Sequence, residues 1–148
     1  IHGVSGDEGH EQGIETLLVH PAGAICTDAN DFGRGKPHPA AYGTYPRVLS
    51  RYVRSRKLLT LEWAIHKITG YPAALLRLAD RGVVRRRAFA DLVIFDPATI
   101  DSAASFESSR VMAKGIDLVL VNGAVAFAPG EQGGIAAKPA GRVIRRKG

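Results

Sequence analysis

Hydrophobic residues follow a helical period in the first half of this chain and a strand period in the second half. Apolar side chains recur at the i, i+3, i+4 spacing of amphipathic helices in residues 11–20, 44–56 and 61–68. Thr60 stands directly before the third stretch, where its hydroxyl can accept a backbone N–H as an N-cap. Pro72 is placed where a further short helix can begin, because its missing N–H is not needed there.

The second half predicts a small antiparallel sheet. Residues 90–95 form a short apolar run that ends at an Asp-Pro pair, which is typical of a strand. Two apolar runs within residues 118–127 flank Asn122 and Gly123, the strongest short-range signal for a β-hairpin. Residues 143–144 are expected to add a last edge strand.

A short apolar stretch, residues 24–27, leads to Asp28 and then to a long polar loop that ends at Gly43. This pattern predicts a buried strand that delivers a carboxylate to its carboxyl end, preceded by the helix of a βαβ unit. In parallel α/β folds, ligands and catalytic groups gather at that end of the strands. Two interpretations of Asp28 follow: it is a working residue, or it is a turn residue that accepts backbone N–H bonds of the loop.

Composition and charge limit the classes of function. With 45% hydrophobic and 23% charged residues over 148 positions, the chain is long and apolar enough for one domain with a core. Its formal charge of +6 suits an anionic partner, but the cations are scattered and only 7% of residues are aromatic. A nucleic-acid partner is therefore not expected, since stacking residues and a reading motif are missing. Four cations on the 44–56 helix are expected to form a solvated face: Arg47, Arg51, Arg54 and Lys57.

Cysteine usage and apolar run lengths exclude further classes. Cys26 is the only cysteine, so an internal disulfide and a multi-cysteine zinc site are excluded, and we expect this residue to pack. No apolar run approaches the roughly 20 residues that span a bilayer, so no membrane partner is expected. No signal-peptide pattern is visible, and a cytoplasmic location is expected. The sequence begins with Ile1 instead of Met, so it can be read as a piece of a longer protein.

Several short motifs follow one another in a fixed order along residues 11–148. Each motif is weak alone, but the ordered set is specific: Pro37-His38-Pro39, Tyr42-Gly43-Thr44-Tyr45-Pro46-Arg47-Val48-Leu49, Thr69-Gly70-Tyr71-Pro72-Ala73, Asp80-Arg81-Gly82, Ala90-Asp91-Leu92-Val93-Ile94-Phe95-Asp96-Pro97, Val121-Asn122-Gly123 and Gly141-Arg142-Val143-Ile144-Arg145. The set resembles the C-terminal region of the N-acyl-D-amino-acid deacylases, or D-aminoacylases, of the metal-dependent amidohydrolase superfamily.

The resemblance implies an α/β fold in two parts. Residues 1–82 would be the C-terminal part of an amidohydrolase (β/α)8 barrel, with its last helix and strand and the helices that trail them. Residues 83–148 would supply the C-terminal strands of the small β-sandwich that accompanies the barrel. This division agrees with the change of hydrophobic period along the chain.

The resemblance also implies a site. In such enzymes a carboxylate at the end of the eighth strand lies beside the zinc, takes a proton from the activated water and gives it to the leaving amine. Asp28 matches that position, which favours its first interpretation. The family usually has an arginine for the substrate carboxylate directly after the His-Pro pair, where this chain has Ala40. Arg34 or Lys36 is a candidate substitute, and His38 is expected to face the active-site mouth as a second substrate-binding residue.

The metal ligands are the main departure from the family. The five histidines form neither a His-x-His nor a His-Glu-x-x-His pattern, whereas a catalytic zinc needs about three protein ligands. We therefore expect the C-terminal portion of a zinc-dependent amidohydrolase of non-peptide C–N bonds, inactive alone, whose small-molecule partner is an N-acyl amino acid or a related amide. The alternative is a non-catalytic remnant, or a subunit whose partner chain completes the barrel.

Overall fold

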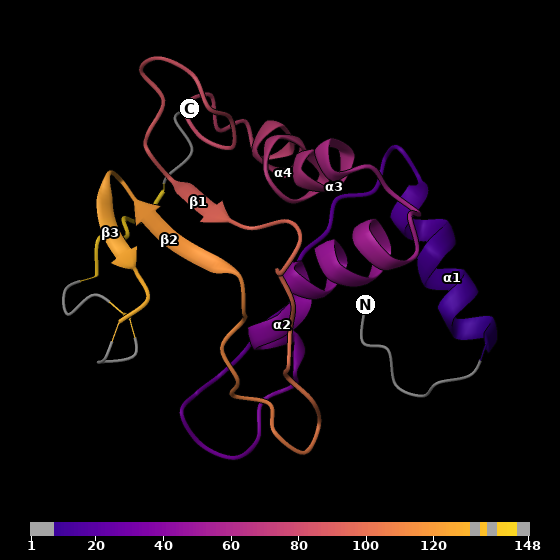
Figure 1. Ribbon diagram of the computed structural model, residues 1–148. Helices are drawn as coiled ribbons and strands as arrows, with labels where there is room; N and C mark the ends of the chain where they lie inside the picture. Colours follow the sequence, from indigo (N-terminus) through magenta and orange to yellow (C-terminus); the bar gives the residue numbers. More distant parts are fainter. Residues whose placement is uncertain (1–7, 131–133, 136–138, 145–148) are drawn as a thin grey trace.

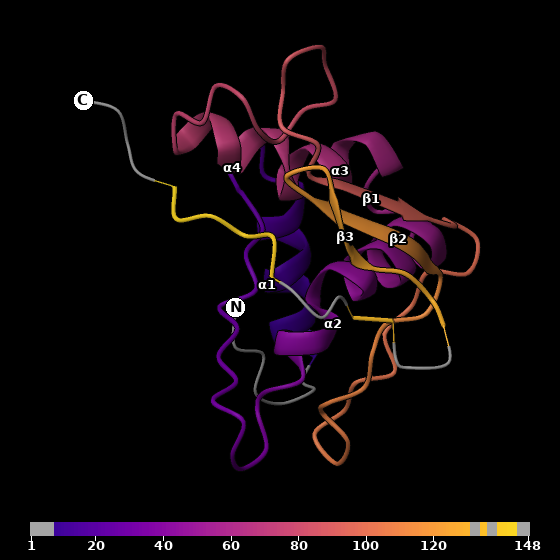
Figure 2. The same ribbon diagram turned by 90° about the vertical axis from the view of Figure 1, so that its left-hand side faces the viewer.

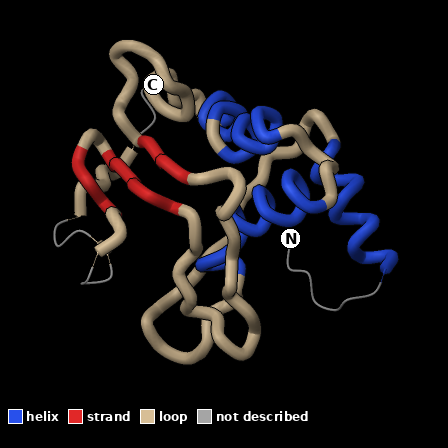
Figure 3. Tube along the Cα trace, viewed as in Figure 1, coloured by secondary structure: helices blue, strands red, loops and turns tan. Residues whose placement is uncertain are grey.

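The computed structural model describes residues 8–130, 134–135 and 139–144, with a group of helices beside a small sheet (Figure 1). The helices lie on one side of the molecule and the strands on the other (Figure 3). The elements in chain order are α1 (Glu8–Val19), α2 (Ala40–Arg47), the π-helix η1 (Val48–Ser55), α3 (Leu61–Ile68), α4 (Gly70–Leu75), β1 (Leu92–Phe95), β2 (Ile116–Val121) and β3 (Ala124–Phe127).

Local sequence signals predict the helices well. The predicted helix of residues 11–20 is confirmed as α1, and the predicted helix of residues 44–56 is confirmed as the continuous pair α2 and η1. That pair begins earlier than predicted, and its second half winds as a π-helix. Thr60 caps α3 as predicted, since its hydroxyl oxygen accepts the backbone N–H of Trp63 at 3.2 Å. The next helix, α4, begins just before Pro72.

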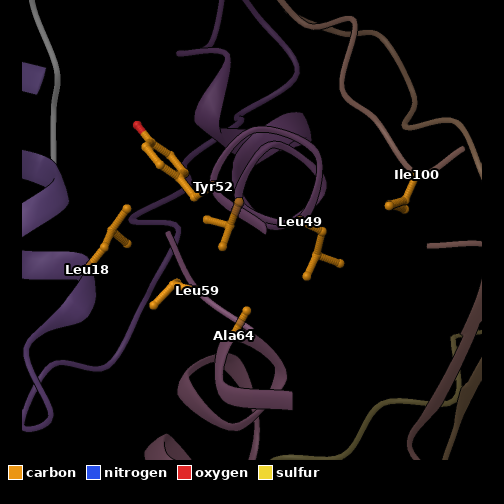
Figure 4. Packing of buried hydrophobic residues seen from close by; sticks show 7 residues of the cluster. Leu18, Leu49, Tyr52, Leu59, Ala64 and Ile100 are labelled. Atoms are coloured by element: carbon orange, nitrogen blue, oxygen red, sulfur yellow. The ribbon is translucent and has the colours of Figure 1, made fainter. Parts of the chain in front are cut away.

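One hydrophobic core joins the helices to the C-terminal half of the chain. Its side chains come from α1, η1, α3 and two connecting segments (Figure 4): Leu18, Leu49, Tyr52, Leu59, Ala64 and Ile100. Ile100 belongs to the segment between β1 and β2 and is only 2% exposed. Phe95 of β1 and Ile116 of β2 pack against the same cluster. The sheet is therefore fixed to the helices by apolar burial, the main stabilising term in folding.

Glu11 holds α1 against η1. Its Oε1 accepts hydrogen bonds from Arg51 Nη2 at 2.9 Å, from Arg56 Nη1 at 2.9 Å and from the hydroxyl of Tyr52 at 3.1 Å. Burial raises the pKa of the Glu11 carboxyl, but the hydrogen bonds from Arg51 and Tyr52 and the nearby positive charges outweigh burial. The pKa therefore lies below its ordinary value, and the carboxylate is the favoured form.

The prediction of a solvated basic face on this helix is wrong for two of its four cations. Arg51 binds α1, and Arg54 donates a hydrogen bond of 2.7 Å from Nη1 to the carbonyl of Ile100. The physical reason is that a guanidinium has five N–H donors and satisfies the acceptors of segments packed against the helix. Arg47 and Lys57 are exposed, as predicted.

The predicted sheet is confirmed. Its three strands are antiparallel in the order β1-β2-β3, with Leu92 of β1 opposite Leu120 of β2. Asn122 and Gly123 join β2 to β3 with φ angles of 51° and 82°. Both angles are in the left-handed region that the tightest hairpin turns require, and Asn and Gly adopt it at low cost.

The predicted edge strand at residues 143–144 is wrong, because these residues are irregular and lie outside the sheet. Asn122 donates from Nδ2 to the carbonyl of Ala140 at 2.6 Å, which holds this part of the chain at the hairpin turn. From there the chain does not run along an edge of the sheet. Val143 is 85% exposed, so an apolar pair in the sequence did not lead to burial.

Several large apolar side chains of the described residues are exposed: Phe32, Leu75, Leu76, Val84 and Phe106. Among the helices in the described ranges, none has the length and apolar character needed to cross a membrane.

Candidate functional site

The segment that leads to Asp28 is irregular, so the predicted strand at residues 24–27 is wrong. A strand exists by hydrogen bonding to a neighbouring strand. The neighbour of this segment is a helix instead, because the N–H of Ile25 donates to the carbonyl of Lys67 in α3 at 3.1 Å. Cys26 is exposed, which makes its predicted packing role wrong for the same reason. Without a sheet around the segment, Cys26 is left uncovered, although Ile25 beside it packs against the core.

Asp28 is exposed and has a φ angle of +46°. The other described non-glycine residues with positive φ lie just after a helix or within a turn: Lys57, Arg77, Arg87 and Asn122. Asp28 has neither setting, since residues 23–32 contain no turn or helix. Asp tolerates this conformation better than most residues do, and such backbone is often found at functional sites when neighbouring structure holds it.

The loop after Asp28 is bound to a distant segment by one ion pair. Arg110 donates from Nε and Nη2 to the two carboxylate oxygens of Asp31, at 2.8 and 2.9 Å, and from Nη1 to the carbonyl of Gly35 at 2.9 Å. The hydroxyl of Tyr42 donates to the same carboxylate at 2.9 Å. The hydrogen bonds from Arg110 hold the pKa of the Asp31 carboxyl well below its usual range. We call this contact of Asp31 with Arg110 and Tyr42 the downstream anchor.

The two loops that the downstream anchor joins extend to the same end of the molecule in both views (Figures 1 and 2). Lys36 Nζ donates to the carbonyl of Glu107 at 3.2 Å. The ring of His38 packs edge-to-face on Phe106, with 5.2 Å between the ring centres, and its Nδ1 accepts the N–H of Ala40 at 3.1 Å. The structure thus brings His38 and Lys36 against residues 105–110.

Arg34 lies at the exposed tip of the same loop, between Gly33 and Gly35. Within the described part of the chain its side chain makes no hydrogen bond or ion pair. Lys36, the other candidate for a substrate carboxylate, already donates to a backbone carbonyl. Arg34 is therefore the candidate cation of this loop that remains available for a ligand.

Sequence reasoning missed the residues that hold this region in place. Asp31 carries a weak local signal, because an Asp two residues before a Gly is a common turn pattern, and its Oδ1 does accept the N–H of Gly33. Arg110 carries no signal, since its partner lies far away in the chain. Lys67 follows Ala64 by one helical turn and is fully buried, but a charged residue type is not expected there.

Zinc was expected only in a complete enzyme, and the described residues do not hold it alone. They contain no group of three or more His, Cys, Asp or Glu side chains that could bind a metal ion. Asp28 is therefore not part of a metal centre that this chain can form from its described residues.

Comparisons with known proteins agree on one family. Residues 12–127 match the model of the amidohydrolase family. The chain is 45% identical over 111 residues to a D-aminoacylase of Alcaligenes xylosoxydans xylosoxydans, which covers 75% of the chain and 22% of the relative. It is 44% identical over 138 residues to an N-acyl-D-glutamate deacylase of the same organism, which covers 92% of the chain and 27% of the relative. The chain thus spans about a quarter of the length of these relatives.

Solved structures give the same result. A crystal structure of D-aminoacylase matches 95% of the chain with a TM-score of 0.85 and 39% identity, over 28% of its own length. A second structure, of N-acyl-D-glutamate deacylase from Bordetella bronchiseptica with zinc and a phosphonate inhibitor, matches 84% with a TM-score of 0.75 and 38% identity, over 26% of its length. A further D-aminoacylase structure, with a TM-score of 0.83, concerns the role of a binuclear metal centre.

Proposed function

The chain belongs to the amidohydrolase family, and we propose that it is the C-terminal part of a zinc-dependent enzyme that hydrolyses the amide bond of N-acyl-D-amino acids. Residues 1–82 would be the end of a (β/α)8 barrel, with its last helix, the irregular segment that leads to Asp28 and the trailing helices. Residues 83–148 would be the end of a small β-sandwich. The proposal rests on the match of 95% of the chain to D-aminoacylase at a TM-score of 0.85 and 39% identity.

Asp28 would move the proton of the reaction. Its carboxylate would take a proton from the attacking water as the oxygen bonds to the amide carbon, and would give it to the nitrogen as the C–N bond breaks. The products would be a carboxylic acid and a free amino acid, and the proton of the new acid then passes to the amine, so atoms and charge balance. The exposed position and the left-handed backbone of Asp28 support this role. Any zinc beside Asp28 would take its ligands from residues outside the described part of this chain.

Arg34 and His38 would bind the substrate. Arg34 would pair with the substrate carboxylate, in place of the arginine that Ala40 replaces. A guanidinium suits this task, because it binds a carboxylate through two parallel hydrogen bonds. His38, half-buried against Phe106, would line the mouth of the site.

The test compares the isolated chain with a chimera. The chimera is the Alcaligenes xylosoxydans xylosoxydans D-aminoacylase with its matching segment replaced by this chain. We expect the chimera with zinc to hydrolyse N-acetyl-D-amino acids and the isolated chain to show no turnover. A folded but inactive chimera would contradict the proposal. Turnover by the isolated chain that Asp28→Asn abolishes would contradict the argument that its metal ligands lie elsewhere.

A second candidate is a non-catalytic remnant or a subunit that needs a partner chain to complete the barrel. The large apolar side chains that the described residues expose, such as Phe32, Val84 and Phe106, favour a missing covering layer of protein. Light scattering on the chain tests the premise that both candidates share, because an uncovered apolar surface leads to association or aggregation. A stable monomer would contradict both the incomplete barrel and the missing partner.

A further inference from the structure

Lys67 is the largest fully buried side chain in the described core, with 1% of its surface exposed. Lysine is almost never fully buried unless it is paired. Its Nζ donates to the carbonyl of His20 at 2.6 Å and lies 5.3 Å from the centre of the Trp63 ring. Burial lowers the pKa of Lys67. The carbonyl of His20 directly follows the C-terminus of α1, where the helix dipole favours a cation.

The same region of α3 and α4 makes two more hydrogen bonds to the segment after α1. The carbonyl of Lys67 accepts the N–H of Ile25 at 3.1 Å, and the hydroxyl of Tyr71 donates to the carbonyl of Ala22 at 3.1 Å. Residues 20, 22 and 25 are thus each bound to a residue of α3 or α4. We call these three hydrogen bonds the upstream anchor.

Asp28 lies between two fixed points. Ile25 of the upstream anchor precedes it by three residues, and Asp31 of the downstream anchor follows it by three. Three residues span at most about 10 Å when fully extended, so Asp28 stays within that distance of Ile25 and of Asp31. The left-handed φ of Asp28 thus occurs in a segment that has no turn and no partner strand but is held on both sides.

We propose that Lys67 and Tyr71 are positioning residues that hold residues 20–25 and thereby set the direction of the Asp28 carboxylate. The holding of residues 20–25 does not depend on the proposed function, and only its effect on catalysis rests on that function. A carboxylate that moves a proton must lie within hydrogen-bond reach of the reacting atoms, so a loose upstream segment lowers kcat. Substrate affinity depends on the loop of Arg34 and His38, which the downstream anchor holds separately, so KM changes little.

Cys26 provides a direct readout, because it is exposed, unique in the sequence and located between Ile25 and Asp28. A nitroxide label on Cys26 reports the mobility of this segment by electron paramagnetic resonance in the full chain, with no need for activity. Tyr71→Phe removes one hydroxyl, and Lys67→Met removes the ammonium. Lys57→Met is the matched control, because Lys57 is exposed and its side chain makes no hydrogen bond or ion pair within the described ranges.

We expect Tyr71→Phe and Lys67→Met to increase the mobility of the label, with unchanged helical circular dichroism, and Lys57→Met to leave it unchanged. Unchanged mobility in Tyr71→Phe would overturn the role of Tyr71. Unchanged mobility in a folded Lys67→Met would overturn the role of Lys67. If Lys67→Met loses its helical signal, Lys67→Gln replaces it in the test. The amide of Gln can still donate a hydrogen bond, so we expect a smaller increase in the mobility of the label.

The chimera tests the catalytic consequence. We expect Lys67→Met to lower kcat by about tenfold to a hundredfold, the cost of misplacing a reacting group by up to about 1 Å, with KM changed less than threefold. A raised KM at unchanged kcat would overturn the link to Asp28. An inactive parent chimera would contradict the proposed function, while the label on Cys26 would still decide whether the upstream anchor holds the segment.

Discussion

Arg110 donates hydrogen bonds to both carboxylate oxygens of Asp31, although 79 positions separate the two residues in the chain. Bidentate pairs of this kind fix orientation as well as distance. The pair joins the loop after Asp28 to the segment between β1 and β2, so the candidate active-site mouth is built from both halves of the chain. The loop beside Asp28 is therefore held by a segment that is distant in the sequence.

Asp31→Asn is expected to loosen the loop of residues 31–36. The change removes the negative charge that Arg110 binds but keeps the trypsin site after Arg34, whereas Lys36 precedes Pro37 and is not a trypsin site. Limited trypsin digestion should therefore cut the variant faster after Arg34. Asp117→Asn, at an exposed position of β2, is the matched control and should digest at the parental rate. Equal rates for both variants would show that the ion pair does not order the loop.

The lowered pKa of Glu11 predicts that the helical half of the chain loses stability in acid. The pKa of its carboxyl is lowered in the fold, so it stabilises the folded state above the ordinary pKa of 4.5. That contribution is lost as the pH falls from 4.5 through the lowered value. Glu11→Gln should lower the free energy of unfolding at pH 7 by about 2 kcal/mol, because hydrogen bonds to a charged group are lost.

Urea denaturation at pH 7 and pH 3 checks the role of Glu11. The difference in stability between parent and Glu11→Gln should shrink at pH 3, because below pH 4.5 the unfolded parent takes up a proton at Glu11 more readily than the folded parent does. A difference that is independent of pH would mean that Glu11 acts by packing alone.

Ile100 is expected to hold the sheet to the helices. Ile100→Ala removes a side chain that is 2% exposed, and such truncations cost about 2–5 kcal/mol. Urea unfolding followed by Trp63 fluorescence measures this loss from α3, on the other side of the core. Ile94→Ala is the control in β1, where the side chain is 54% exposed, and its midpoint should move far less. Equal shifts for the two variants would contradict the shared core.

Short-range patterns in the sequence predict the helices and the hairpin, because their signals are local. Thr60 caps its own helix, and Asn122 with Gly123 closes its own turn. The predicted strands at 24–27 and 143–144 fail because a strand also needs a partner, and no local pattern says which segment will pair with it. Instead, residues 20–25 bind α3 and α4, and Ala140 binds the hairpin turn.

In the candidate site, too, some residues are predicted by local sequence patterns, whereas others act on partners that are distant in the sequence. The place of Asp28 after an apolar stretch predicts a working residue, and the resemblance to a family adds Arg34 and His38; all three roles stay predictions. The residues that hold this region were not predictable from local pattern. Lys67 is a charged residue in a buried position, and Arg110 acts on a partner 79 positions away.

The central claim is that Asp28 is the proton-transferring carboxylate of an amidohydrolase, and kcat for N-acetyl-D-amino acids in the chimera tests it most directly. Asp28→Asn keeps the shape of the side chain but cannot carry the proton, so kcat should fall by about 10²–10⁴-fold. Asp117→Asn, the same change at an exposed position, should keep the parental kcat. If Asp28→Asn retains the parental kcat in a folded and active chimera, the claim is wrong.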